Sequence, residues 1–202
     1  TDTDTDTDTD TDTDTDTDVL SISDVKTGGE YVDGDMVSLT GVVATSSVAT
    51  NGMGFFVQDE GGGQYSGMFI YLGSVEMEVA VGDVMDVTGT LTEYYDLTEI
   101  TVASIDDITV TGSGSVTYET FETAPSDWEA YESALVSLNG ITVTSDVDEY
   151  GQVQTDWGVL IDDLLYTHEA ANGTTYASIN GPLYYSYSEF KVTPRDAADL
   201  VE

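Results

Sequence analysis

The sequence contains no cysteine, only three basic residues and a single histidine among its 202 residues. Without cysteine the chain has no disulfide, no thiolate nucleophile and no Cys-ligated metal. The basic residues are Lys26, Lys191 and Arg195. The sequence has 40 acidic residues, so the net charge at pH 7 is −37. Because Lys and Arg supply most of the affinity for nucleic acid, this balance argues strongly against nucleic acid as a partner. Anionic membrane surfaces are disfavoured on the same grounds.

The sequence also has no run of about eighteen apolar residues, so we expect no transmembrane helix and no direct membrane insertion. It shows neither an initiator methionine nor a signal peptide, which indicates a processed or truncated chain whose targeting segment has been removed. The acidic, Lys-poor composition, rich in Thr, Ser, Gly and Tyr, favours a secreted or surface-displayed bacterial protein. We therefore expect an extracellular or cell-surface location.

The residues after position 18 have the pattern of β-strands. Runs of β-branched and aromatic residues such as MVSLTGVV, GFFVQD and DVMDVTGTLTEY are separated by Gly, Asn and Asp. Helical signals are limited to a turn within residues 125–138 and a short terminal helix within 194–201. The sequence therefore predicts an all-β fold.

An internal repeat divides this β region into two units. VSLTGVVATS at residues 37–46 and VSLNGITVTS at 136–145 share six identities in ten. We predict an extended segment over residues 1–18 and two five-stranded units over 19–112 and 113–202. Each has a glycine inside a long strand, Gly89 and Gly181, where a small barrel bends to close. This is the pattern of a five-stranded Greek-key barrel of the OB type, here in tandem.

Residues 36–110 also resemble the OB-fold-like domains of secreted bacterial multidomain proteins. The most specific pieces are FFVQD at residues 55–59 and VGD at 81–83 followed by Gly89; the second unit matches through its ending at 190–199. Such domains often accompany extracellular nucleases or phosphatases. The resemblance implies a fold and a compartment. It does not imply hydrolysis, since the chain has no catalytic nuclease domain, and we expect no enzymatic activity.

Few residues suggest chemistry. His168 lies in a polar stretch, and we expect it at the surface, with nothing nearby that suggests a catalytic triad. Asp146 and Asp148 begin like a calcium loop that has its glycine at position six, Gly151. The loop lacks the acidic residue required at position twelve, so a hairpin turn is the competing interpretation. We expect no cofactor other than this weak candidate Ca²⁺ site.

Tyr184, Tyr185, Tyr187 and Phe190 form an aromatic cluster that could serve as a stacking platform for bases or sugars. The period of two in a strand places Tyr185 and Tyr187 on one face and Tyr184 on the other. Half of the cluster should therefore be core. Ordinary strand packing or a contact between subunits is the competing interpretation.

The first eighteen residues are nine Thr-Asp dipeptides, which have too little apolar surface to fold alone. An extended chain would place every threonine on one face, where O-glycans would stiffen it. The segment resembles the short-repeat segments of extracellular glycofibrils. The resemblance implies covalent glycans on nine threonines: Thr1, Thr3, Thr5, Thr7, Thr9, Thr11, Thr13, Thr15 and Thr17.

The apolar residues that follow, Val19, Leu20 and Ile22, have the alternation of a strand. This strand would be either the first of the local barrel or one that pairs with the next subunit, and repeated pairing of that kind builds a filament. Our leading hypothesis is an extracellular structural protein, a filament subunit that self-associates through a glycosylated linker. The alternatives are a non-catalytic binding module for a glycan or a Ca²⁺-bridged partner, and an accessory region of a secreted nuclease or phosphatase.

Overall fold

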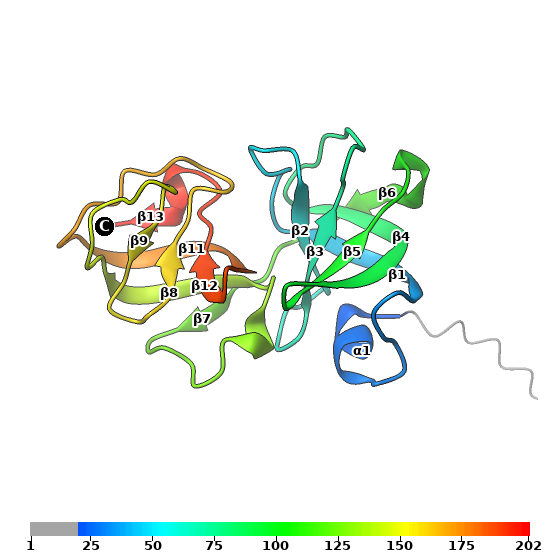
Figure 1. The fold of residues 1–202 in the computed structure, drawn as a ribbon, viewed down its shortest axis with the longest axis horizontal. Helices are drawn as coiled ribbons and strands as arrows, with labels where there is room; N and C mark the ends of the chain where they lie inside the picture. The colour runs from blue at the N-terminus through cyan, green and yellow to red at the C-terminus, as the bar shows by residue number, and fades with distance from the viewer. Residues whose placement is uncertain (1–19) are drawn as a thin grey trace, which may run out of the picture.

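The computed structural model describes residues 20–202, which form two β-sheet units that lie side by side (Figure 1). We call them the N-terminal unit, with a six-stranded sheet, and the C-terminal unit, with a seven-stranded sheet. The only α-helix in this range is α1 (Ile22–Thr27), with three 3₁₀ turns, η1 (Ile105–Asp107), η2 (Glu129–Tyr131) and η3 (Ala197–Asp199). The prediction of an all-β fold is confirmed. No helix within residues 20–202 is long and apolar enough to cross a membrane.

Five strands of the N-terminal unit pair in a cycle, β1-β2-β3-β5-β4-β1, and β6 adds to β4. All pairs in the cycle are antiparallel except β3 with β5, which is parallel. Because β1 borders both β2 and β4, these five strands close on themselves. The strands are β1 (Met36–Ala44), β2 (Gly54–Gln58), β3 (Gly67–Tyr71), β4 (Asp83–Tyr94), β5 (Leu97–Thr101) and β6 (Ile108–Ser113).

The C-terminal unit repeats this strand order. Five of its strands run in the order β8-β11-β12-β10-β9, β7 adds to β8, and β13 pairs with β11. A bridge between Val143 and Thr155 joins the ends of β8 and β9. The pair β10–β12 is parallel, as β3–β5 is. The strands are β7 (Glu119–Phe121), β8 (Leu135–Thr142), β9 (Val153–Gln154), β10 (Leu160–Ile161), β11 (Thr175–Ser186), β12 (Glu189–Val192) and β13 (Leu200–Val201).

Glycines at matching positions shape both units. Gly41 in β1 and Gly140 in β8 have φ of 73° and 69°, a left-handed conformation that glycine adopts without strain. At Gly89 in β4 a Cβ would lie 2.6 Å from the carbonyl oxygen of Thr101, and at Gly181 in β11 it would lie 2.2 Å from that of Thr193. In both units, therefore, the long strand carries a glycine where another part of the chain passes too close for a side chain.

The predicted strand at residues 19–22 is wrong for the part that the structure describes. Leu20 precedes α1, and Ile22 is the first residue of that helix and is fully buried in the core of the N-terminal unit. Ser21 and Asp24 form a capping box, in which each side chain accepts a hydrogen bond from the backbone of the other. This local bonding favours a helix over a strand, so Leu20 and Ile22 offer no edge to another subunit. Val19 and Thr1–Asp18, with every threonine predicted to carry a glycan, lie outside the described residues.

Of the two expected helical segments, 125–138 contains the 3₁₀ turn η2 and, from Leu135, the start of strand β8. The segment 194–201 contains the 3₁₀ turn η3 and strand β13.

A candidate binding site between two hairpins

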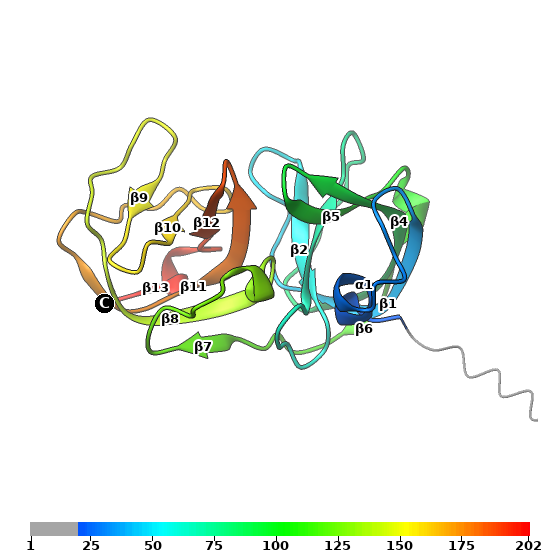
Figure 2. The same ribbon diagram turned by 60° about the horizontal axis from the view of Figure 1, so that its bottom comes forward.

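The two units meet through apolar side chains on the outside of the N-terminal sheet. Along β2 and β3 alternate residues face the core of the unit, so Phe56 and Phe69 face outward, where Leu164 and Leu165 of the C-terminal unit cover them. The ring of Tyr184, on β11, lies 5.9 Å from both phenylalanine rings, centroid to centroid. The hairpin of β11 and β12 lies on the side of its unit that faces the N-terminal unit (Figures 1 and 2).

Polar contacts also join the units. Lys26 of α1 lies 2.9 Å from the carboxylate of Glu132, and the two side chains are only 6% and 1% exposed. The same carboxylate accepts a hydrogen bond from the backbone of Thr98 at the start of β5. Gly67 on β3 approaches the backbone of residues 133 and 134 so closely that a Cβ there would lie 2.1 Å from the amide nitrogen of Ala134. These contacts hold the two units in one arrangement.

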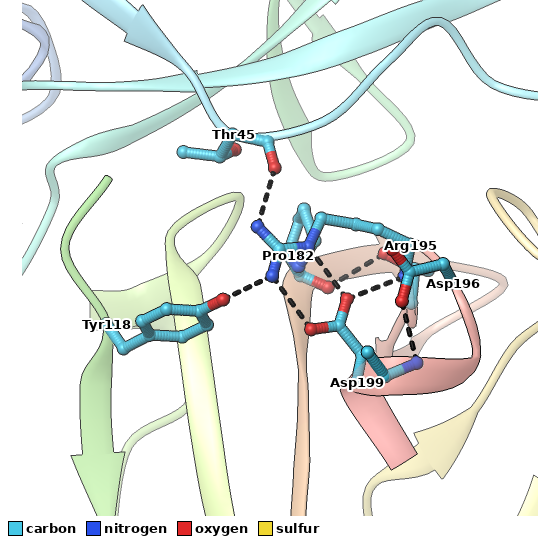
Figure 3. A network of polar contacts seen from close by, with 8 residues as sticks. Thr45, Tyr118, Pro182, Arg195, Asp196 and Asp199 are labelled. Carbon is cyan, nitrogen blue, oxygen red and sulfur yellow. Dashed lines mark hydrogen bonds and ion pairs between the residues drawn. The ribbon is translucent and has the colours of Figure 1, made fainter. Parts of the chain in front are cut away.

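Arg195 makes the second charged connection (Figure 3). Its guanidinium donates two hydrogen bonds to Asp199, at 2.7 and 2.8 Å, one to the hydroxyl of Tyr118, and one to the carbonyl oxygen of Thr45 in the other unit. Burial disfavours its charge, but the bonds to Asp199 outweigh this and raise the pKa of Arg195. Lys191 lies 3.7 Å from Asp162, so each of the three basic residues pairs with a carboxylate.

Two equivalent hairpins end beside each other at this junction. The two-residue turns are Tyr95–Asp96 between β4 and β5, and Tyr187–Ser188 between β11 and β12. All four residues have φ between 51° and 68°, as in a type I′ turn, although none is glycine. This conformation is uncommon for residues other than glycine.

The tips border a groove of about 540 Å³ whose walls carry five tyrosines: Tyr94, Tyr95, Tyr184, Tyr185 and Tyr187. We call it the tyrosine groove. The side chains of Tyr95 and Tyr187 are 79% and 91% exposed, which is uncommon for such large apolar surfaces. Tyr94 and Tyr95 contact each other edge to face, with centroids 4.8 Å apart. The groove thus offers tyrosine side chains to solvent, and the Nζ of Lys191 lies over the ring of Tyr187, 5.5 Å from its centroid.

A smaller cavity of about 280 Å³ shares Tyr94, Leu97 and Tyr184 with the groove. The charged residue in its lining is Glu99, which lies on the outer face of β5 because Ile100 points into the core. The C-terminal unit covers this face of β5, so Glu99 is only 5% exposed. Burial raises the pKa of Glu99 to about 7, with a smaller opposing effect from the Thr101 hydroxyl. We call this cavity the Glu99 pocket.

The structure brings the predicted aromatic cluster only partly together. Tyr184, Tyr185 and Tyr187 all line the groove, whereas Phe190 packs against the ring of Tyr185 at 4.8 Å between centroids. The predicted alternation ends at Ser186, because Tyr187 belongs to the turn. Sequence reasoning missed Tyr94, Tyr95 and Glu99, although the repeat aligns the end of β4 with the end of β11.

The other predicted sites lie elsewhere. Asp148 accepts hydrogen bonds from the backbone of Tyr150 and Gln152, at 2.9 Å each, and so closes a turn, while Asp146 is exposed. Within residues 20–202 no group of three or more His, Asp or Glu side chains is arranged to hold a metal ion. The prediction of a surface histidine is wrong: His168 is 6% exposed, burial lowers its pKa, and its Nδ1 accepts a hydrogen bond from the backbone of Ala170.

No protein-family model, curated protein or solved structure matches this chain.

Proposed function

We propose that the protein is a non-catalytic extracellular binding module, and that its tyrosine groove binds a glycan that carries no negative charge. The observation that carries this proposal is the pair of equivalent hairpins, each with an exposed tyrosine at its tip, on either side of one groove. Sugar rings pack their apolar faces on aromatic rings, and a groove whose two walls are fixed against each other loses little entropy on binding.

The charge of the chain favours this ligand over other ring-bearing ones. Nucleic-acid bases would also stack on tyrosines, but their phosphates would meet a chain with a net charge of −37 whose three basic residues are already paired. A neutral glycan has no such penalty.

A filament subunit remains the second proposal, and it depends on the nine Thr-Asp dipeptides alone. The helix at Ile22 removes the strand that would have joined subunits from residue 20 onward. Glycosylation of the threonines would be visible as hexose-sized increments above 21.6 kDa in the intact mass of native protein, and fibres would be visible by electron microscopy. A bare polypeptide mass together with isolated particles would contradict this second proposal.

The binding module is tested by screening the full chain against an array of neutral oligosaccharides and measuring affinities for the ligands found. We expect Tyr95→Ala and Tyr187→Ala each to weaken binding tenfold or more. Tyr150→Ala is the matched control, because Tyr150 is also an exposed tyrosine in a turn but lies outside the groove. The absence of any bound glycan, or an equal loss in the control, would refute the proposal.

A further inference from the structure

The Glu99 pocket combines a carboxylate with aromatic walls. Phe69, Tyr71, Tyr94 and Tyr184 line it, and Glu99 is the one charged residue among its lining. A buried carboxylate is normally paired with a cation or held by several donors. The three basic side chains of the chain, all of them within the described residues, pair instead with Glu132, Asp162 and Asp199.

A pocket of this composition suits an organic cation. Aromatic rings attract ammonium groups through their electron-rich faces, and the attraction strengthens as water is removed. A carboxylate at the same place adds a charge-assisted hydrogen bond. The volume of about 280 Å³ is large enough for an amino or methylated amino group together with its nearest carbons. The acidic surface of the chain would draw such a cation toward the site.

We propose that the Glu99 pocket binds an ammonium group of the ligand, so that the protein prefers glycans with free amino groups to neutral ones. The inference rests on the proposed function because it takes a glycan in the tyrosine groove as the ligand. The pocket and the groove share Tyr94, Leu97 and Tyr184. A glycan on the groove tyrosines therefore lies beside the pocket, and an amino group on its ring meets Glu99 where a hydroxyl or an acetamide would not form an ion pair.

The test compares a β-1,4-linked glucosamine tetramer with the glucose tetramer of the same linkage, by calorimetry on the full chain at pH 7. We expect the amino sugar to bind at least tenfold more tightly, and Glu99→Gln to reduce this preference to less than twofold. Glu76→Gln, which removes one exposed carboxylate away from the pocket, should keep the preference. About 0.3 M NaCl in the buffer screens the general attraction of the acidic surface.

Tetramethylammonium, titrated alone, tests the pocket without any glycan. Its binding to the wild type and not to Glu99→Gln would support the ammonium site even if no glycan binds, in which case only the proposed function fails. An equal affinity for both tetramers, or a preference that survives Glu99→Gln, would overturn the inference and leave neutral glycan binding intact. If neither tetramethylammonium nor the amino sugar binds, the inference is wrong.

Discussion

Arg195, near the C-terminus, donates a hydrogen bond of 3.2 Å from its Nη1 to the carbonyl oxygen of Thr45, which lies 150 residues earlier in the other unit (Figure 3). Together with the ion pair between Lys26 and Glu132, it commits two of the three basic residues of the chain to the junction between the units. Two of the few basic side chains of the protein thus connect the two units that carry the hairpins. The geometry of the candidate binding site depends on this junction.

Arg195→Lys should destabilise the protein although it keeps the charge. A lysine has no planar fork, so it cannot bond Asp199, Tyr118 and Thr45 together. We expect a loss of about 1–3 kcal/mol in the free energy of unfolding, measured by urea denaturation. Because a lysine would keep a cation close to Asp199, Arg195→Met should cost more than Arg195→Lys. An Arg195→Lys variant as stable as the wild type would contradict the geometric argument.

Lys26→Met should cost about 3–5 kcal/mol, because it leaves the carboxylate of Glu132 buried without a cation. The double variant Lys26→Met, Glu132→Gln should recover part of this loss, since the uncompensated charge is then absent. Urea denaturation of the two single variants and the double variant gives the coupling between the residues. Simple additivity of the two single losses would show that the ion pair does not hold the units together.

The sequence was informative about the sheets and uninformative about the junction. Period-two alternation is a local feature, and it predicted the all-β fold; the glycines at positions 89 and 181 marked the bends of the long strands. The short apolar run around Ile22 suits a strand and a helix equally, and only the Ser21–Asp24 capping box would have distinguished them.

Glu99 could not be recognised in the sequence, because its burial depends on Tyr184, which comes from a strand of the other unit. Carboxylates are too common in this chain for one of them to stand out by residue type. His168 was misjudged for a related reason: its polar neighbours suggested a surface loop, while the fold buries the side chain in the C-terminal unit.

Gly67→Ala should separate or distort the units. The new Cβ would lie 2.1 Å from backbone atoms of residues 133 and 134, which cannot rotate away as a side chain would. We expect a loss of about 1–3 kcal/mol in the free energy of unfolding and a weaker binding of any groove ligand. Gly112→Ala is the matched control, since a Cβ at that position meets nothing within 4 Å. A control variant as unstable as Gly67→Ala would assign the effect to the backbone rather than to the junction.

Glu99 should make the stability of the protein fall as pH rises. Its pKa is about 7 in the folded protein and near 4.5 when the chain is unfolded, so between these values the folded state holds a proton that the unfolded state has released. Folding is therefore favoured most below about pH 4.5, and this contribution is lost as the pH rises toward 7. We expect the loss to be on the order of 1–2 kcal/mol, roughly half of what the shift alone implies, because the pocket admits some water.

The measurement compares the wild type with Glu99→Gln, since other carboxylates change the stability of both proteins equally. Tyr71, Tyr94 and Tyr184, from β3, β4 and β11, line the pocket together with Glu99, and no second carboxylate or basic group lines it. The difference in unfolding free energy between the two proteins should thus shift in favour of the variant between pH 5 and pH 8. A difference that stays constant over this range would mean that Glu99 is already ionised at pH 5, and that it is held in the pocket as a charge.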